Sequence, residues 1–242
     1  MHALPRGAHI GRCAGDAVGR TGEGRLAGTV LDISRVDALR PITTGADGTV
    51  RIGAGATWTD LVAAPLPPAF DGLKAAAREV GAIQIQNRAT LAGNLCTASP
   101  AGDGIPCLLA LGARIEIRAA IGGRTLSLSR FITGVRKTAL RPDEMVTAII
   151  VPPPPAGARS AFAKLGARHS LVISIAMASA LVAADDAGAI TRAAIAVGAC
   201  SPVALRLAAL EGELVGTPLA HAAAAVRPPH LGALSPLSDV RG

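Results

Sequence analysis

The residues best suited to chemistry lie in one segment of small side chains, from Gly81 to Leu111. Within it, the groups that could bind a ligand are Thr90, Gly93, Asn94, Thr97, Ser99 and Asp103. Short donors and unhindered backbone N–H groups let an anionic pyrophosphate approach the main chain closely. Asp103 could accept hydrogen bonds from a sugar-like chain of hydroxyls. The segment therefore indicates a candidate site for a phosphorylated ligand.

The same composition also fits a tight connection that is rich in turn-forming residues, and composition alone leaves both interpretations open. The glycine patterns of the Walker and Rossmann nucleotide sites are not present in the sequence, so these common motifs do not decide. Pro106 at a predicted helix start, followed by Cys107–Leu111, would close the loop against the core.

Cysteine spacing and charge distribution argue against two other classes of site. The four cysteines are Cys13, Cys96, Cys107 and Cys200. They form no C-x-x-C pair and have no histidine at ligand spacing, so neither zinc nor an iron–sulfur cluster is predicted on this chain.

The net charge is +7, but the arginines are scattered and only 2% of residues are aromatic. Because base-stacking platforms are missing, we expect no nucleic-acid partner.

Hydropathy gives an expectation about location. No basic-then-apolar leader opens the sequence, and the longest apolar run, Leu171–Ala184, is too short for a helix to cross a bilayer of about 30 Å. The sequence therefore predicts a cytoplasmic protein without a membrane span.

Strands and helices that could position the candidate segment are visible on both sides of it. Alternating or β-branched patterns predict strands at Thr29–Ile33, Thr49–Ala54, Glu144–Val151, Ala161–Leu165, Met177–Ala184 and Ile190–Gly198, and a hairpin from Arg114–Ala119 and Arg124–Ser129. Helices are predicted over Thr57–Ala64, capped by Thr57, over Leu73–Val80, and over Val203–Val215, capped by Ser201 with Pro202 at its first position. The fold class is therefore α+β.

Four consecutive prolines, Pro152–Pro155, mark the predicted domain boundary. Prolines cannot donate to a strand ladder and hold the chain extended. We accordingly expect one domain over residues 1–155 and a smaller α+β domain over 156–242.

A family resemblance distinguishes between the two interpretations of the central segment. Gln84–Arg88, Thr90–Asn94, Ala98–Asp103 and Leu108–Ala113 resemble the second flavin motif of the FAD-binding subunits of molybdenum hydroxylases, the xanthine and carbon monoxide dehydrogenase type. Further segments resemble this family in the same order: Leu31–Ile42, Val50–Leu61, Phe162–Ala176 and Ser235–Gly242. The resemblance covers most of the chain from about Thr29 onward.

The resemblance implies a fold and a set of FAD contacts. The fold would be a two-lobed FAD-binding domain of the vanillyl-alcohol oxidase type, followed by a small α+β domain. Thr90, Gly93, Asn94 and Thr97 would contact the pyrophosphate and ribityl regions, and Asp103 the ribityl or phosphate-linked part. Gly53, Ala54 and Gly55 would line the dinucleotide, and Met145 and Val146 would pack beside the ring system. Lys164 would stabilise charge on the reduced flavin, the alternative being a solvated surface lysine.

The function implied is that of an oxidoreductase subunit that moves electrons. A molybdenum-binding large subunit would oxidise the substrate, a 2Fe-2S small subunit would relay electrons, and the FAD of this chain would pass them to NAD or another acceptor. No residue of this chain would act on the substrate itself.

Two departures from the family pattern leave a second hypothesis open. The first flavin motif, A-G-G-T-D-L, has only Cys13–Gly19 near its place, and Ala92 replaces the first glycine of the second motif. A left-handed backbone at Ala92 would cost about 1–2 kcal/mol. The chain is also expected to be shortened at both ends. The alternative is thus a degenerate homologue that keeps the fold without binding flavin.

Overall fold

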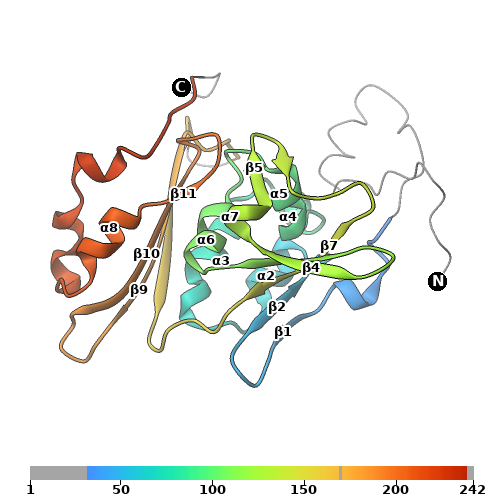
Figure 1. Ribbon diagram of the computed structural model, residues 1–242, viewed down its shortest axis with the longest axis horizontal. Helices are drawn as coiled ribbons and strands as arrows, with labels where there is room; N and C mark the ends of the chain where they lie inside the picture. The colour runs from blue at the N-terminus through green and yellow to red at the C-terminus, as the bar shows by residue number, and fades with distance from the viewer. Residues whose placement is uncertain (1–31, 169–170, 239–242) are drawn as a thin grey trace.

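The computed structural model describes residues 32–168 and 171–238, which form two main antiparallel sheets with helices between them (Figure 1). The larger sheet has five strands in the order β1-β2-β7-β3-β4, and the smaller has four in the order β11-β10-β9-β8. A two-stranded ribbon, β5-β6, lies apart from both. The helices that support the candidate site belong to the layer between the two main sheets.

The five-stranded sheet confirms most of the strands predicted in the first part of the chain. Its members are β1 (Ile42–Thr44), β2 (Val50–Gly53), β3 (Arg114–Arg118), β4 (Gly123–Ser127) and β7 (Met145–Val151). The β3–β4 hairpin forms as expected, because Gly122 takes a φ of +81° in its turn and alternate residues of β3 enter the core. The strand predicted at residues 29–33 lies outside the described residues apart from 32 and 33, which are not in a strand. The short edge strand β1 was not predicted.

The four-stranded sheet confirms the predicted meander in the second part of the chain. It consists of β8 (Arg159–Leu165), β9 (Ala176–Ala184), β10 (Ile190–Gly198) and the short β11 (Leu205–Arg206). Gly188, with a φ of +81°, completes the β9–β10 turn. Beyond the prolines, the chain passes from β7 in one sheet to β8 in the other, while the predicted division into domains at residue 155 stays a prediction.

The helix predicted over Val203–Val215 is wrong in its first half. Leu205–Arg206 pair with Ala196–Val197 as β11, and the helix α8 covers only Ala208–Leu214. Ser201 does not cap a helix, because its hydroxyl donates to the carbonyl of Cys200 and accepts from the amide of Ser235. A free edge of β10 competes for this segment, and its backbone bonds outweigh the local helical pattern.

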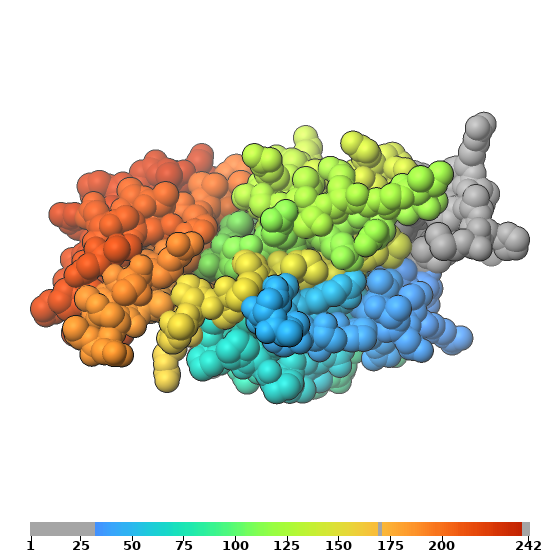
Figure 2. All heavy atoms as spheres, turned by 60° about the horizontal axis from the view of Figure 1, so that its bottom comes forward, coloured from blue at the N-terminus to red at the C-terminus, as the bar shows by residue number. Residues whose placement is uncertain are grey.

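One continuous core joins the two sheets. Helix α3 (Asp71–Glu79) packs on β8, and α6 (Gly104–Ala110) packs on β9 and β10. All seven residues of α6 are buried, and the main cluster extends from β2 to β10. Figure 2 shows the yellow residues near the end of β7 between the blue and green elements, with the orange and red C-terminal part beside them. The start of α6 is thereby held at the junction of the two sheets.

The segment predicted as a loop after Gly81 is partly helical, which corrects that expectation. It contains α4 (Ile83–Gln86) and α5 (Leu91–Thr97), and α5 begins where the Thr90 hydroxyl accepts a hydrogen bond from the amide of Gly93. Helix α2 (Trp58–Ala63) precedes them and is capped by Thr57 as predicted. Thr57 and Thr90 form an isolated β-bridge, which holds the starts of α2 and α5 together.

The remaining elements are short. They are η1 (Asp37–Leu39), η2 (Pro68–Phe70), α7 (Leu128–Phe131), β5 (Ile132–Gly134), β6 (Lys137–Thr138), η3 (Leu219–Ala225) and η4 (Pro228–Leu231). Among the described residues, none of the helices has the length and apolar character that crossing a membrane requires.

Candidate functional site

Helix α5 presents one polar stripe. Thr90, Asn94 and Thr97 are half-buried, whereas the other described positions of the helix are buried. Their spacing of four and three residues places them on one face of a helix. The Thr90 hydroxyl already accepts from Gly93, so its own hydrogen remains available to a ligand. This stripe therefore offers hydroxyl and amide donors along about two turns.

Gly93 and Ala92 lie on the buried side of α5. The amide of Gly93 is engaged with Thr90, so it can take part in a site only through close approach of the backbone. Ala92 is 3% exposed and is absent from the described residues with positive φ. A right-handed helical residue tolerates a Cβ, so the expected left-handed strain at Ala92 does not arise.

The strand end at Gly53–Gly55 lies close to α5 but its amides are already used. Gly53 donates to the carbonyl of Pro41, Ala54 to that of Thr147, and Gly55 to that of Leu39. A Cβ on Gly53 would lie 2.1 Å from the Leu39 oxygen, so the close approach of this neighbouring backbone requires a glycine here. These three residues can line a ligand by shape but have no amide left to donate.

A second group of predicted residues meets where α6 begins. The Lys164 ammonium lies 3.2 Å from Asp103 Oδ2, and the side chains are only 5% and 12% exposed. The Ser174 hydroxyl donates to Asp103 Oδ1 over 2.7 Å. The alternative of a solvated surface lysine at Lys164 is therefore wrong. Among the described residues, Asp103 is the only side chain that the Lys164 ammonium contacts.

Asn94 connects the two groups. Its Oδ1 accepts a hydrogen bond from the amide of Gly104 at 3.3 Å, which is the first amide of α6. The polar stripe of α5 thus reaches the end of α6 at which Asp103 lies. Met145 begins β7, the strand that contacts both β2 and α5, and Val146 beside it is buried.

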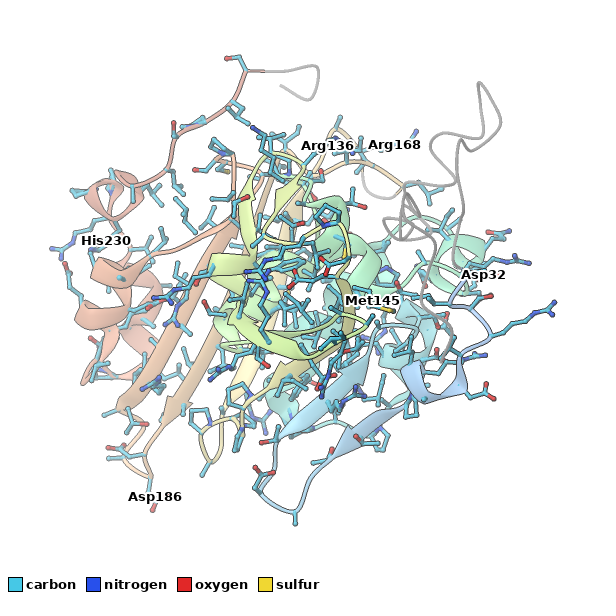
Figure 3. The ribbon with its side chains drawn as sticks, turned by 45° about the vertical axis from the view of Figure 1, so that its right-hand side comes forward. Asp32, Arg136, Met145, Arg168, Asp186 and His230 are labelled. Atoms are coloured by element: carbon cyan, nitrogen blue, oxygen red, sulfur yellow. The ribbon has the colours of Figure 1, made fainter. Side chains whose placement is uncertain are left out.

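Figure 3 places Met145 near the middle of the molecule, whereas Asp186 and His230 lie toward the end formed by β9, β10 and α8. Arg136 and Arg168 lie at the upper end in the same view.

A hollow of ≈ 400 Å³ opens at Lys164 and is lined by Glu79, Leu165, Gly166 and Arg168 as well. Lys164 therefore has access to a space that a ligand could enter.

The thiol next to this site is chemically inert. Burial raises the pKa of Cys107 to about 12, and the negative charge of Asp103 adds to the shift. Its sulfur lies 3.6 Å from the Gly72 carbonyl oxygen, between α6 and α3. At neutral pH it stays protonated and acts as a packing residue rather than as a nucleophile.

Ser174 contacts this site, and sequence reasoning did not identify it. It is 0% exposed and lies in the apolar run Leu171–Ala184. A hydroxyl inside such a run needs a buried partner, because an unpaired one would cost about 1–3 kcal/mol. That signal indicates that a partner exists, but it does not say which residue provides it.

Comparisons with known proteins identify the family. Residues 18–154 match the family described as the FAD binding domain in molybdopterin dehydrogenase. The chain is 37% identical over 194 residues to the nicotinate dehydrogenase FAD-subunit of Eubacterium barkeri, covering 78% of this chain and 65% of that protein. It is 32% identical over 192 residues to the putative xanthine dehydrogenase FAD-binding subunit XdhB of Escherichia coli K12, again covering 78% and 65%.

A solved structure shows the same fold. The carbon monoxide dehydrogenase from Hydrogenophaga pseudoflava that lacks the Mo-pyranopterin moiety of its cofactor matches with a TM-score of 0.79 and 27% identity, over 100% of this chain and 91% of that one. The predicted mixture of helices and sheets is thereby confirmed.

The chain belongs to the family of FAD-binding domains of molybdopterin dehydrogenases, and its cofactor is FAD. This agrees with the expectation drawn from the motifs of the central segment. The chain spans about 65% of the length of the curated relatives it matches.

Proposed function

We propose that this chain is the electron-transfer subunit of a multi-subunit molybdenum hydroxylase or dehydrogenase, and the observation that carries the proposal is the environment of Lys164. The side chain is 5% exposed, yet among the described residues its ammonium has a single hydrogen-bond partner, Asp103. An ammonium has three donors, and leaving buried donors unused is unfavourable. An anionic ligand in the adjoining hollow would satisfy the remaining donors.

A second set of donors, on α5, fits the phosphate and ribityl parts of FAD. Thr90, Asn94 and Thr97 supply two hydroxyls and an amide along one face of α5. The set is uncharged and made of short side chains, so a pyrophosphate can approach the helix closely, while Lys164 would stabilise charge on the reduced flavin. Gly53, Ala54, Gly55 and Gly93 would complete the site by shape, Asp103 by accepting from ribityl hydroxyls, and Met145 by packing against the ring.

When bound, FAD supplies reversible electron transfer, and this chain's residues would bind and orient it. A molybdenum-cofactor large subunit and a 2Fe-2S small subunit would be the partners, and NAD or another molecule would accept the electrons. The relatives support this assignment, since they are named as FAD subunits of nicotinate and xanthine dehydrogenases. The complex would be cytoplasmic, and the fold would be the two-lobed vanillyl-alcohol oxidase type with its domain boundary at residue 155.

The visible absorption spectrum of the chain, purified alone and with its partner subunits, tests the proposal. We expect the two bands of oxidised flavin at one FAD per chain, and bleaching of both bands by dithionite. A colourless protein that takes up no added FAD would contradict the proposal and favour a degenerate homologue that keeps only the fold.

Two lysine variants test which residue supplies the charge. Lys164→Met should weaken FAD binding by about 10- to 100-fold, because a charge-assisted hydrogen bond contributes about 1.5–3 kcal/mol. Lys137→Met is the matched control, since Lys137 is exposed on β6. Equal FAD affinities of the two variants, measured by fluorescence titration, would exclude Lys164 from the site.

A further inference from the structure

Asp103 occupies a position where its side chain would ordinarily cap a helix, but it does not do so. It is the N-cap residue of α6 and makes no side-chain capping bond. Asn94 Oδ1 accepts from the Gly104 amide instead. An aspartate at an N-cap typically contributes about 1 kcal/mol by capping. The Asp103 carboxylate is therefore directed elsewhere, toward Lys164 on β8 and Ser174, two residues before β9.

Both oxygens of Asp103 have a defined partner. Oδ1 accepts from the Ser174 hydroxyl at 2.7 Å, and Oδ2 contacts the Lys164 ammonium at 3.2 Å. A bond to Oδ1 fixes the rotation of the carboxylate about its last torsion, which is otherwise broad. With that rotation fixed, Oδ2 remains turned toward Lys164.

The backbone holds Ser174 firmly for this role. Next to it, the amide of Ile175 donates to the carbonyl of Leu165 at 2.8 Å, and Leu165 pairs with Ala176 in the ladder of β8 and β9. Ser174 is 0% exposed, so water does not compete for its hydroxyl. The lysine thus lies on β8 and the donor two residues before β9, and Asp103 contacts both.

We propose that Ser174 is a positioning residue that, through Asp103, holds the Lys164 ammonium in the orientation that favours reduced, negatively charged FAD. The effect on FAD rests on the function proposed above, whereas the effect on Lys164 does not. Without the hydroxyl, the carboxylate can rotate and the ammonium loses its fixed place. The preference for reduced FAD over oxidised FAD then falls, because a displaced charge stabilises the reduced form less.

The test compares Ser174→Ala with Ser179→Ala in the full chain. Ser179 is the matched control, because it is buried in β9 and its hydroxyl donates to the carbonyl of Ala161 rather than to Asp103. Redox titration of bound FAD gives the ratio of affinities for the reduced and oxidised forms. We expect Ser174→Ala to lower this ratio about five-fold, the equivalent of one neutral hydrogen bond of about 1 kcal/mol, and Ser179→Ala to leave it unchanged.

A measurement without flavin keeps the two proposals separate. The sequence has three lysines, Lys74, Lys137 and Lys164, so lysine labelled with ¹³C at Cε gives three NMR signals. The Lys164 signal is assigned by its loss in Lys164→Met, and it should shift in Ser174→Ala but not in Ser179→Ala. If the wild-type chain binds no FAD, the proposed function fails and this signal alone decides the role of Ser174.

An unshifted Lys164 signal in Ser174→Ala would overturn the positioning role whether or not FAD binds. A shifted signal with an unchanged affinity ratio in the FAD-bound chain would overturn its effect on the flavin. If Ser174→Ala does not fold, Ser174→Cys replaces it in both measurements, because the thiol is of similar size and a weak donor. The same two results decide the question for that variant.

Discussion

Two ion pairs in this molecule differ in how completely their polar atoms are used. In the five-stranded sheet, Arg124 binds Glu144 through two parallel bonds of 2.7 Å, and the Arg141 amide donates to the same carboxylate. Arg124 also donates to the carbonyl of Ala139. Where α6 meets β8, Lys164 has only Asp103 among the described residues. Among the described residues, the first pair engages both carboxylate oxygens and three of the five guanidinium N–H groups, whereas the second engages one of the three ammonium donors.

The two threonine caps repeat this difference. The Thr57 hydroxyl donates to Asp60 and accepts from its amide, so both of its capacities are engaged. Among the residues that the structure describes, the Thr90 hydroxyl only accepts, from Gly93. Polar groups that are hydrogen-bonded within the protein stabilise the fold. Buried groups with unused donors indicate where a ligand is expected. This difference in hydrogen bonding supports the candidate site independently of the similarity to known proteins.

Breaking the Arg124–Glu144 ion pair should give the largest loss of stability. Arg124→Ala leaves Glu144 buried without its countercharge, which should lower the free energy of unfolding by about 3 kcal/mol. Arg114→Ala on the adjacent strand β3 is the control, because Arg114 is exposed and should change stability by less than about 0.5 kcal/mol. Urea denaturation measures both. Similar losses for the two variants would mean that the bidentate pair contributes nothing beyond a surface arginine.

The same pair should make stability depend on acid pH. The bonds from Arg124 lower the pKa of Glu144 from 4.5 to about 2. Because the folded carboxyl binds its proton more weakly than the unfolded one, its contribution is fully present above pH 4.5 and is lost as the pH falls toward 2. Because Arg124 is 29% exposed, solvent screens the pair, and the contribution should be about 1 kcal/mol.

Glu144→Gln isolates this contribution from those of the other carboxylates. The difference in the free energy of unfolding between the wild type and this variant should be largest near pH 6 and shrink steadily below pH 4.5. Urea denaturation at a series of pH values measures it. Parallel pH profiles of the two proteins would show that Glu144 ionises normally in the folded state.

The two caps should separate stability from binding. Thr57→Ala and Thr90→Ala each remove an N-cap and should each cost about 1 kcal/mol of stability. Only Thr90→Ala should also weaken FAD binding, by about ten-fold, because only its hydroxyl has a hydrogen left to donate. Thermal denaturation and FAD titration of both variants check this. If Thr57→Ala weakened FAD binding equally, the distinction between used and unused donors would be wrong.

The sequence predicted the β3–β4 hairpin and the Thr57 cap well. The β3–β4 hairpin follows from alternation and from Gly122-Gly123, and the Thr57 cap follows from a hydroxyl just ahead of an apolar stretch. Each is decided by residues close together in the chain. Helix α5 was mistaken for a loop, because four of its seven residues, Gly93, Asn94, Cys96 and Thr97, have weak intrinsic helix propensity.

The arrangement of the candidate site was less accessible to the sequence. Motif resemblance singled out Asp103 and Lys164, but they are 61 residues apart, and Ser174 lies 71 residues from Asp103. Contacts of this separation depend on how α6 packs on the second sheet, and no local pattern encodes that packing. The hydroxyl in an apolar run could signal a buried bond, but only the fold identified its acceptor.

The smallest expected effect concerns Ala92, the residue that departs from the family's glycine. Ala92 is buried in the right-handed turn at the start of α5, so Ala92→Gly should lower stability by about 0.5–1 kcal/mol through backbone entropy. It should leave FAD affinity unchanged, because the donors of the polar stripe lie on the other face of the helix. FAD titration and thermal denaturation of this variant check both expectations. A clear gain in FAD affinity would show that the Ala92 methyl group crowds the ligand. Whether each donor is hydrogen-bonded within the protein would then not be enough to describe the site.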